Sequence, residues 1–113
     1  MDLNKKSEII LKKLKENKFY EVISECEKLI KKFPDKSHLY NMCGLAYQRI
    51  KKIDISINYF KKAIELNPED FGIQNNLANS HKHLDQYDLA ENIFLDILNK
   101  KKDYLPAIAN LAI

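Results

Sequence analysis

The stretch NYFKKAIELNP, residues 58–68, determines how the rest of the sequence is interpreted. Its apolar residues are spaced as on one face of an amphipathic helix. Pro68 ends that helix, because proline lacks the N–H that a helix interior needs. A similar stretch, ECEKLIKKFP, occupies residues 25–34, so Pro34 and Pro68 lie 34 residues apart. This interval suggests a repeating unit.

The same interval relates other residues along the chain. Tyr40 corresponds to Gln74, Gly44 to Ala78, Phe60 to Phe94 and Leu77 to Leu111. NNLAN, at residues 75–79, matches ANLA at 109–112. A period of this length is typical of stacked helical hairpins, so the sequence predicts a helical array.

Each unit has the spacing of two helices. We expect one helix at 37–50 and a second at 54–67, joined by a short turn around Lys51. In the first of these, apolar or small residues at Tyr40, Cys43, Gly44 and Tyr47 form the i, i+3, i+4, i+7 stripe of a buried face. A small residue at Gly44 would let the two helices of the hairpin approach closely.

Composition excludes several classes of protein. Hydrophobic residues make up 45% of the chain and charged residues 31%, with two Gly and three Pro, which favours a helical globular protein. The net charge of +3 is small and its lysines are spread along the chain, so we expect no nucleic-acid binding. No apolar run is long enough to span a bilayer, so no membrane association is expected. Cys26 and Cys43 lie in helical apolar patterns, which favours reduced thiols in a cytoplasmic protein, with a disulfide as the alternative.

These residues resemble the tetratricopeptide repeat, whose 34-residue pattern has fixed places for a large apolar residue, Leu, a small residue, Tyr, Ala, Phe, Ala and Pro. The second unit matches with Tyr40, Cys43, Gly44, Tyr47, Ser56, Phe60, Ala63 and Pro68. The first unit is looser, because Lys6 and Lys13 replace the expected aromatic residues. The resemblance implies an all-α, right-handed solenoid of antiparallel helical hairpins. We expect one array over 1–113, with units at 3–36, 37–70 and 71–104 and a partial fourth at 105–113, cut from a longer protein or completed by association.

No sequence motif indicates catalysis. The chain has no glycine-rich phosphate loop, no GxSxG elbow and no CxxC pair. His81 and His83 are two residues apart, which on a helix directs them to different faces, and His81 occupies the family's buried Tyr place. We therefore expect no enzymatic activity, no metal site and no cofactor.

In tetratricopeptide arrays the first helices of successive units line a concave groove that binds partners. Carried over by position, the predicted groove residues are Asn41, Leu45, Gln48, Asn75, Asn76, Asn79, Lys82 and Asn110. Asparagine amides match the C=O and N–H groups of an extended peptide. NNLAN resembles the asparagine ladder in the superhelix of O-linked N-acetylglucosamine transferase, although Met42 interrupts the ladder beside Asn41. The alternative is that these asparagines are simply solvated.

The sequence therefore predicts a protein–protein interaction module that binds an extended peptide or a partner protein. It does not predict the family's two-carboxylate clamp. The clamp's basic and Asn positions hold Ser7, Leu11, Met42, Gly72 and Asn76, and of these only Asn76 is suited to the role. Two alternatives stay open: the substrate-presenting region of a larger glycosyl- or sulfotransferase, and a self-assembling scaffold. We also expect a homodimer through the C-terminal edge, where Ile108 and Leu111 face outward.

Overall fold

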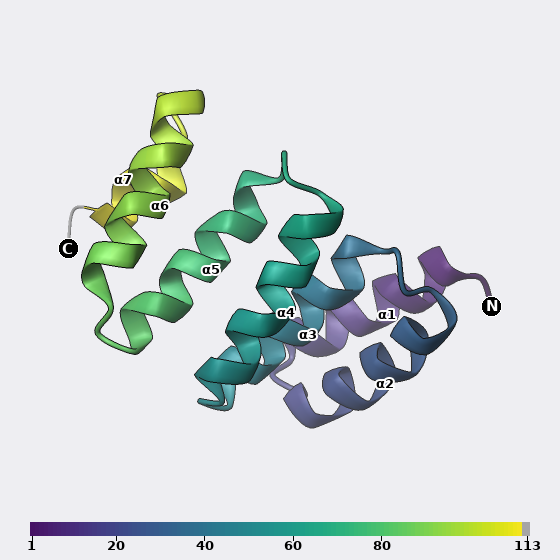
Figure 1. Cartoon of the computed structure of the whole chain (residues 1–113). Helices are drawn as coiled ribbons and strands as arrows, with labels where there is room; N and C mark the ends of the chain where they lie inside the picture. The colour runs from purple at the N-terminus through teal and green to yellow at the C-terminus, as the bar shows by residue number, and fades with distance from the viewer. Residues whose placement is uncertain (112–113) are drawn as a thin grey trace.

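The computed structural model describes residues 1–111 and folds them into helices, with no strand in that range. The helices are α1 (Leu3–Lys15), α2 (Phe19–Lys32), α3 (Ser37–Arg49), α4 (Ile53–Leu66), α5 (Phe71–His83), α6 (Tyr87–Lys100) and α7 (Leu105–Leu111), as Figure 1 shows. The predicted all-α class is confirmed. The helices expected at 37–50 and 54–67 are observed as α3 and α4, each ending one residue earlier than predicted.

Consecutive helices form antiparallel hairpins that stack along one direction (Figure 1). We name them hairpin 1 (α1 and α2), hairpin 2 (α3 and α4) and hairpin 3 (α5 and α6). The odd-numbered helices contact one another along the array, whereas α2, α4 and α6 make no mutual contacts within residues 1–111. The odd-numbered helices therefore lie on the inner, concave side of the curve and the even-numbered helices on the convex side.

The turns inside the three hairpins share one backbone geometry. Asn17, Lys51 and Asp85 have φ values of 63°, 68° and 58°, in the left-handed region, and they recur every 34 residues. At the turn in hairpin 2, the N–H of Lys52 donates to the carbonyl of Tyr47 at 2.9 Å. Bonds at the same two places close hairpins 1 and 3, which is the Schellman pattern at a helix C-terminus.

Each internal junction between hairpins is formed by an even-numbered helix packing on the next odd-numbered helix. α2 covers a stripe of α3, and α4 covers the equivalent stripe of α5. The covered residues are Leu39, Cys43 and Ala46 in α3 and Ile73, Leu77 and Ser80 in α5, all at most 9% exposed. The hydrophobic core is therefore continuous along the array, as expected for stacked repeats.

Close approach of α3 and α4 depends on Gly44. A Cβ atom built at Gly44 would lie 2.7 Å from Cε1 of Phe60, a separation that atoms of this kind do not tolerate. Phe60 itself is fully buried. The small residue expected at this position is thus required by the ring that packs against it.

Candidate functional site: an amide-rich concave groove

The predicted groove residues lie on α3, α5 and α7, which line the concave side. Six of them are partly buried: Asn41, Leu45, Asn76, Asn79, Lys82 and Asn110. The other two, Gln48 and Asn75, are each only 8% exposed. Of the six amide side chains in this set, Gln48 and Asn75 are therefore the most buried.

Two hydrogen bonds between asparagine side chains join neighbouring odd-numbered helices. Nδ2 of Asn76 donates to Oδ1 of Asn41 at 3.0 Å, and Nδ2 of Asn110 donates to Oδ1 of Asn75 at 3.1 Å. Both pairs are separated by 35 residues, so the second bond repeats the first one unit later. We call these two bonds the asparagine rungs.

The first junction lacks an asparagine rung. The positions equivalent to Asn41 and Asn76 in that junction are Ser7 and Met42. The Ser7 hydroxyl is instead within hydrogen-bonding distance of Nε2 of His38, at 3.0 Å. The expected interruption at Met42 is therefore accompanied by a different polar contact between α1 and α3.

Each rung leaves hydrogen-bonding groups available. An asparagine side chain has two N–H donors and a carbonyl oxygen with two lone pairs. In the first rung, Asn41 uses only its oxygen and Asn76 only one N–H. Within residues 1–111, the Nδ2 group of Asn41 and the Oδ1 atom of Asn76 have no other side-chain partner. The Nδ2 group of Asn41 and the Oδ1 atom of Asn76, on adjacent helices, are therefore available to hydrogen-bond another molecule.

Gln48 serves the junction between hairpins 2 and 3. Its Nε2 donates to Oγ of Ser80 at 2.8 Å and to the main-chain oxygen of Asn76 at 3.3 Å. Ser80 also lies 2.9 Å from the hydroxyl of Ser56, so a buried polar network joins α3, α4 and α5. The repeat pattern alone does not predict this network. Serines at 56 and 80, inside otherwise apolar helix faces, were the available signal.

Two nitrogen-bearing side chains, Lys82 and His38, border the groove. Lys82 donates from Nζ to the main-chain oxygen of Asn110 at 3.3 Å, which ties α5 to α7. Partial loss of contact with water, and then the charge of Lys36, lowers the pKa of His38. His38 is therefore neutral at pH 7, and the groove's charge near these residues comes from lysine.

The two cysteines and His81 are buried and serve packing. Burial raises the pKa of the Cys26 and Cys43 thiols to about 12, so both are protonated at neutral pH and are poor nucleophiles. His81 is 9% exposed, and its Nδ1 lies 2.7 Å from Oε1 of Gln86. Within residues 1–111 no three His, Cys, Asp or Glu side chains cluster closely enough to hold a metal ion. None of the helices in that range is long and apolar enough to cross a membrane.

Three comparisons with known proteins agree with this architecture. Tetratricopeptide repeat family models match residues 37–70 and 59–92. A curated relative, the uncharacterized protein ycf37 of Pyropia yezoensis, is 25% identical over 66% of this chain. The matched region spans 47% of that relative, so this chain corresponds to about half of its length.

Solved structures show the same fold at low sequence identity. The first tetratricopeptide domain of human RPAP3 superposes with a TM-score of 0.88 at 20% identity, over 95% of this chain and 84% of that one. The corresponding domain of Spaghetti (RPAP3), bound to the HSP90 peptide SRMEEVD, gives 0.87 at 20% identity, over 95% and 85%. MamA from Desulfovibrio magneticus RS-1 gives 0.77 at 21% identity, over 81% and 52%.

The family models together match residues 37–92, which include the Gly44–Phe60 contact and the left-handed turns at Lys51 and Asp85. The solved structures extend the likeness in fold over 95% of the chain. The chain belongs to the tetratricopeptide repeat family.

Proposed function

We propose that this chain binds an extended polypeptide segment of a partner protein in its concave groove, chiefly through the partner's main chain. The observation that supports the proposal is the asparagine rung, which occurs twice with the same geometry. Rungs that only closed the junctions would need no accessible members. Three of the four asparagines involved are partly exposed.

The chemistry of the rungs suits a peptide backbone. An extended peptide offers alternating N–H and C=O groups, and Asn76 Oδ1 and Asn41 Nδ2 would complement one of each. Each such hydrogen bond contributes on the order of 1 kcal/mol, so several amides along the groove are needed for useful affinity. Contacts of this kind place few demands on the partner's side chains.

Recognition of a terminal carboxylate is not part of this proposal. Leu11, Met42 and Gly72 stand at positions where the family's clamp would need charged or amide groups. The HSP90 peptide seen on Spaghetti (RPAP3) is acidic and belongs to that protein's complex. For this chain we propose that internal segments of a partner, as well as its termini, can enter the groove.

The proposal is tested with peptides selected from a random library for binding to this chain. The double variant Asn41→Ala with Asn76→Ala should weaken the selected peptides about five- to tenfold per lost amide contact, with unchanged helical circular dichroism. The matched control is Asn58→Ala with Asn92→Ala, which removes two exposed asparagines from α4 and α6 on the convex side. Equal affinity for the two double variants would contradict the proposal.

We also propose that the C-terminal edge supports a homodimer. Leu95 and Leu105 are 50% and 73% exposed there, and Ile108 is 43% exposed. Leu111 is partly buried, and residues 112–113 lie outside the described part of the chain. Light scattering across a wide concentration range should show a dimer that Ile108→Glu abolishes. A monomer at every concentration would exclude it.

A further inference from the structure

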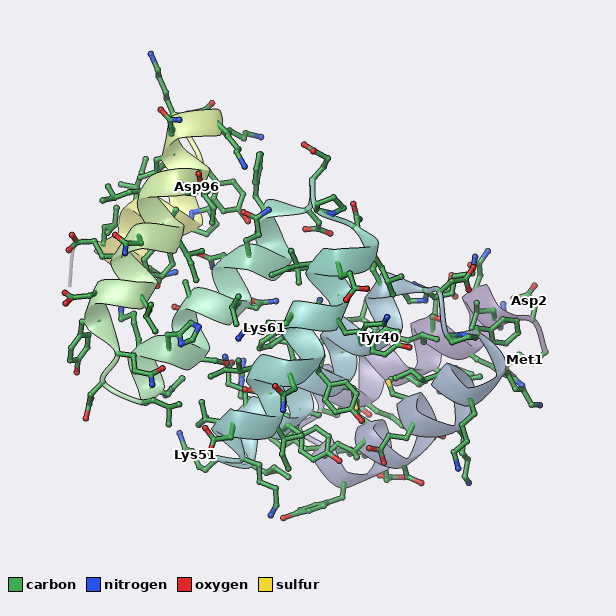
Figure 2. The ribbon with its side chains drawn as sticks, viewed as in Figure 1. Met1, Asp2, Tyr40, Lys51, Lys61 and Asp96 are labelled. Carbon is green, nitrogen blue, oxygen red and sulfur yellow. The ribbon has the colours of Figure 1, made fainter. Side chains whose placement is uncertain are left out.

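The outer face of α1 is the one odd-helix face, within residues 1–111, that no preceding helix covers. On α3 and α5 the equivalent stripes are buried beneath α2 and α4. On α1 the same three positions are Lys5, Ile9 and Lys12, and all three are exposed, with Ile9 at 40%. Figure 2 shows Met1 and Asp2 at this end of the array, opposite the end that carries Asp96.

A hollow of about 670 Å³ opens beside this stripe, between α1 and α2. Its apolar lining includes Ile9 and Leu29. In hairpin 2 the equivalent places of Lys6 and Glu25 hold Tyr40 and Tyr59, whose ring centroids are 6.3 Å apart. In hairpin 1 the hollow is lined by Lys6 and Glu25. In hairpin 2 two tyrosine rings occupy the equivalent positions.

The rim of the hollow carries an excess of uncompensated positive charge. It includes the lysines Lys6, Lys28, Lys31 and Lys32 and a single acid, Glu25. None of these four lysines has an ion-pair partner within residues 1–111, whereas the nearby Lys13 pairs with both Glu21 and Glu25, at 3.7 Å and 2.9 Å. Oε2 of Glu25 is buried and accepts no hydrogen bond there.

We infer that this face, formed by the outer sides of α1 and α2, binds an acidic amphipathic helix of a partner protein. The occupant is a helix because α2 and α4 cover the equivalent faces of α3 and α5, and each packs on the same three positions. It is acidic because lysines replace the buried Leu39 and Ala46 of hairpin 2 at Lys5 and Lys12. A ridge of apolar side chains on that helix would cover Ile9 and enter the hollow, with acids on both flanks.

This surface is separate from the concave groove. The groove is formed by the polar inner faces of α3, α5 and α7, and the face on α1 and α2 lies at the N-terminal end. The inference therefore does not depend on peptide binding at the asparagine rungs. A protein with both surfaces could hold an extended segment and a helix at the same time.

The test uses a synthetic 16-residue helix with leucines at i, i+3, i+4 and i+7 and glutamates on both flanks. Titrated into the ¹⁵N-labelled chain, it should shift amide resonances of α1 and α2 and leave those of α5 unchanged. Ile9→Glu should weaken binding about tenfold or more, because it removes the apolar centre and adds a repelling charge. Ile55→Glu is the matched control, since Ile55 on α4 is 39% exposed and lies away from this face.

Further measurements test whether binding depends on the acidic side chains of the peptide and whether it is independent of the groove. A second peptide with every glutamate replaced by lysine should not bind, and the affinity of the acidic peptide should fall with added salt. Asn41→Ala with Asn76→Ala should bind the acidic helix normally, which keeps this result independent of the groove. Equal binding of both peptides, loss of affinity in the Ile55→Glu control, or binding to phosphatidylserine vesicles without binding to the acidic peptide would each overturn the inference.

Discussion

Hairpins 1 and 2 have the same backbone but fill their interiors with opposite choices of side chain. In hairpin 2 the small Gly44 faces the large Phe60. At the same two places hairpin 1 has Ile10, 2% exposed, and Cys26, fully buried. In hairpin 2 the larger residue of the pair is on the second helix, whereas in hairpin 1 it is on the first helix. What the hairpin requires is a filled volume between its helices, and either helix can supply it.

A second pair of positions differs in chemistry as well as in size. Lys13 and Glu25 form an ion pair in hairpin 1, at 2.9 Å. Their equivalents in hairpin 2 are Tyr47 and Tyr59, stacked with ring centroids 5.4 Å apart. Both tyrosine hydroxyls donate to Oε2 of Glu27, at 3.0 Å and 2.8 Å. Hairpin 1 is thus more polar and more exposed, and hairpin 2 contains the denser core.

The largest expected effect comes from breaking the size pairing in hairpin 2. Phe60→Cys should lower the free energy of unfolding by about 3 kcal/mol, because it leaves a cavity that α3 and α4 cannot close. Gly44→Ile should lower it by about 1–3 kcal/mol or more, because the new side chain overlaps the Phe60 ring. Urea unfolding followed by circular dichroism measures both.

The double variant Gly44→Ile with Phe60→Cys copies the pairing of hairpin 1 into hairpin 2. It should be more stable than the sum of the two single losses predicts, by at least about 1 kcal/mol. Strict additivity would show that the two hairpins differ for a reason other than shared volume.

The tyrosine pair of hairpin 2 should give a smaller change. Tyr59→Phe keeps the ring and removes one hydrogen bond to Glu27, so we expect a loss of about 1 kcal/mol in unfolding free energy. Tyr20→Phe is the control, because Tyr20 is 73% exposed. If both variants melt at the wild-type temperature, the Glu27 bond contributes nothing to stability.

The turns offer a smaller gain in stability. Asn and Asp tolerate the left-handed region better than other residues with a side chain, and hairpins 1 and 3 have Asn17 and Asp85 there. Hairpin 2 has Lys51, so Lys51→Asn should raise the unfolding free energy by roughly 0.5–1 kcal/mol. Lys51→Ala should bring no such gain, because alanine tolerates the left-handed region no better than lysine does. A destabilised Lys51→Asn variant would refute the strain argument.

The smallest effect concerns His38 at the first junction, where partial loss of contact with water and then the charge of Lys36 act on the ring. The pKa of His38 is lowered in the folded chain, so the unfolded chain binds a proton first as the pH falls. The stability present at neutral pH should therefore decline from about pH 6.5 downward and through the folded-state pKa, by less than about 1 kcal/mol after screening. Thermal melts between pH 7.5 and 5.5 should show a smaller decline for His38→Gln than for the wild type. Identical declines would remove His38 from the explanation.

Much of the fold could be predicted from the sequence because its determinants are local. Prolines at a 34-residue interval and the small residue at Gly44 define hairpins that the structure confirms. The exchange of Ile10 and Cys26 was also visible in the sequence as a size mismatch at both places. From the repeat pattern alone, the first unit is only a looser match to the family.

The groove was harder to predict in detail. Its asparagines were identified from their position in the unit, and the structure places them on the concave helices. The sequence could not show that Asn110 bonds with Asn75 and that Asn76 bonds with Asn41, or that Gln48 is buried against Ser80. These contacts depend on the rotation between neighbouring hairpins, which is set by packing across the whole junction.

The positions of the two cysteines have a consequence for kinetics. Cys26 on α2 and Cys43 on α3 are the chain's two cysteines, and both are fully buried in the cluster that joins hairpin 1 to hairpin 2. A thiol reagent can reach either one only when that seam opens transiently, so the labelling rate measures the opening directly. The rate of thiol labelling therefore reports opening of the junction between hairpins 1 and 2. The junction between hairpins 2 and 3 contains no cysteine and does not contribute to that rate.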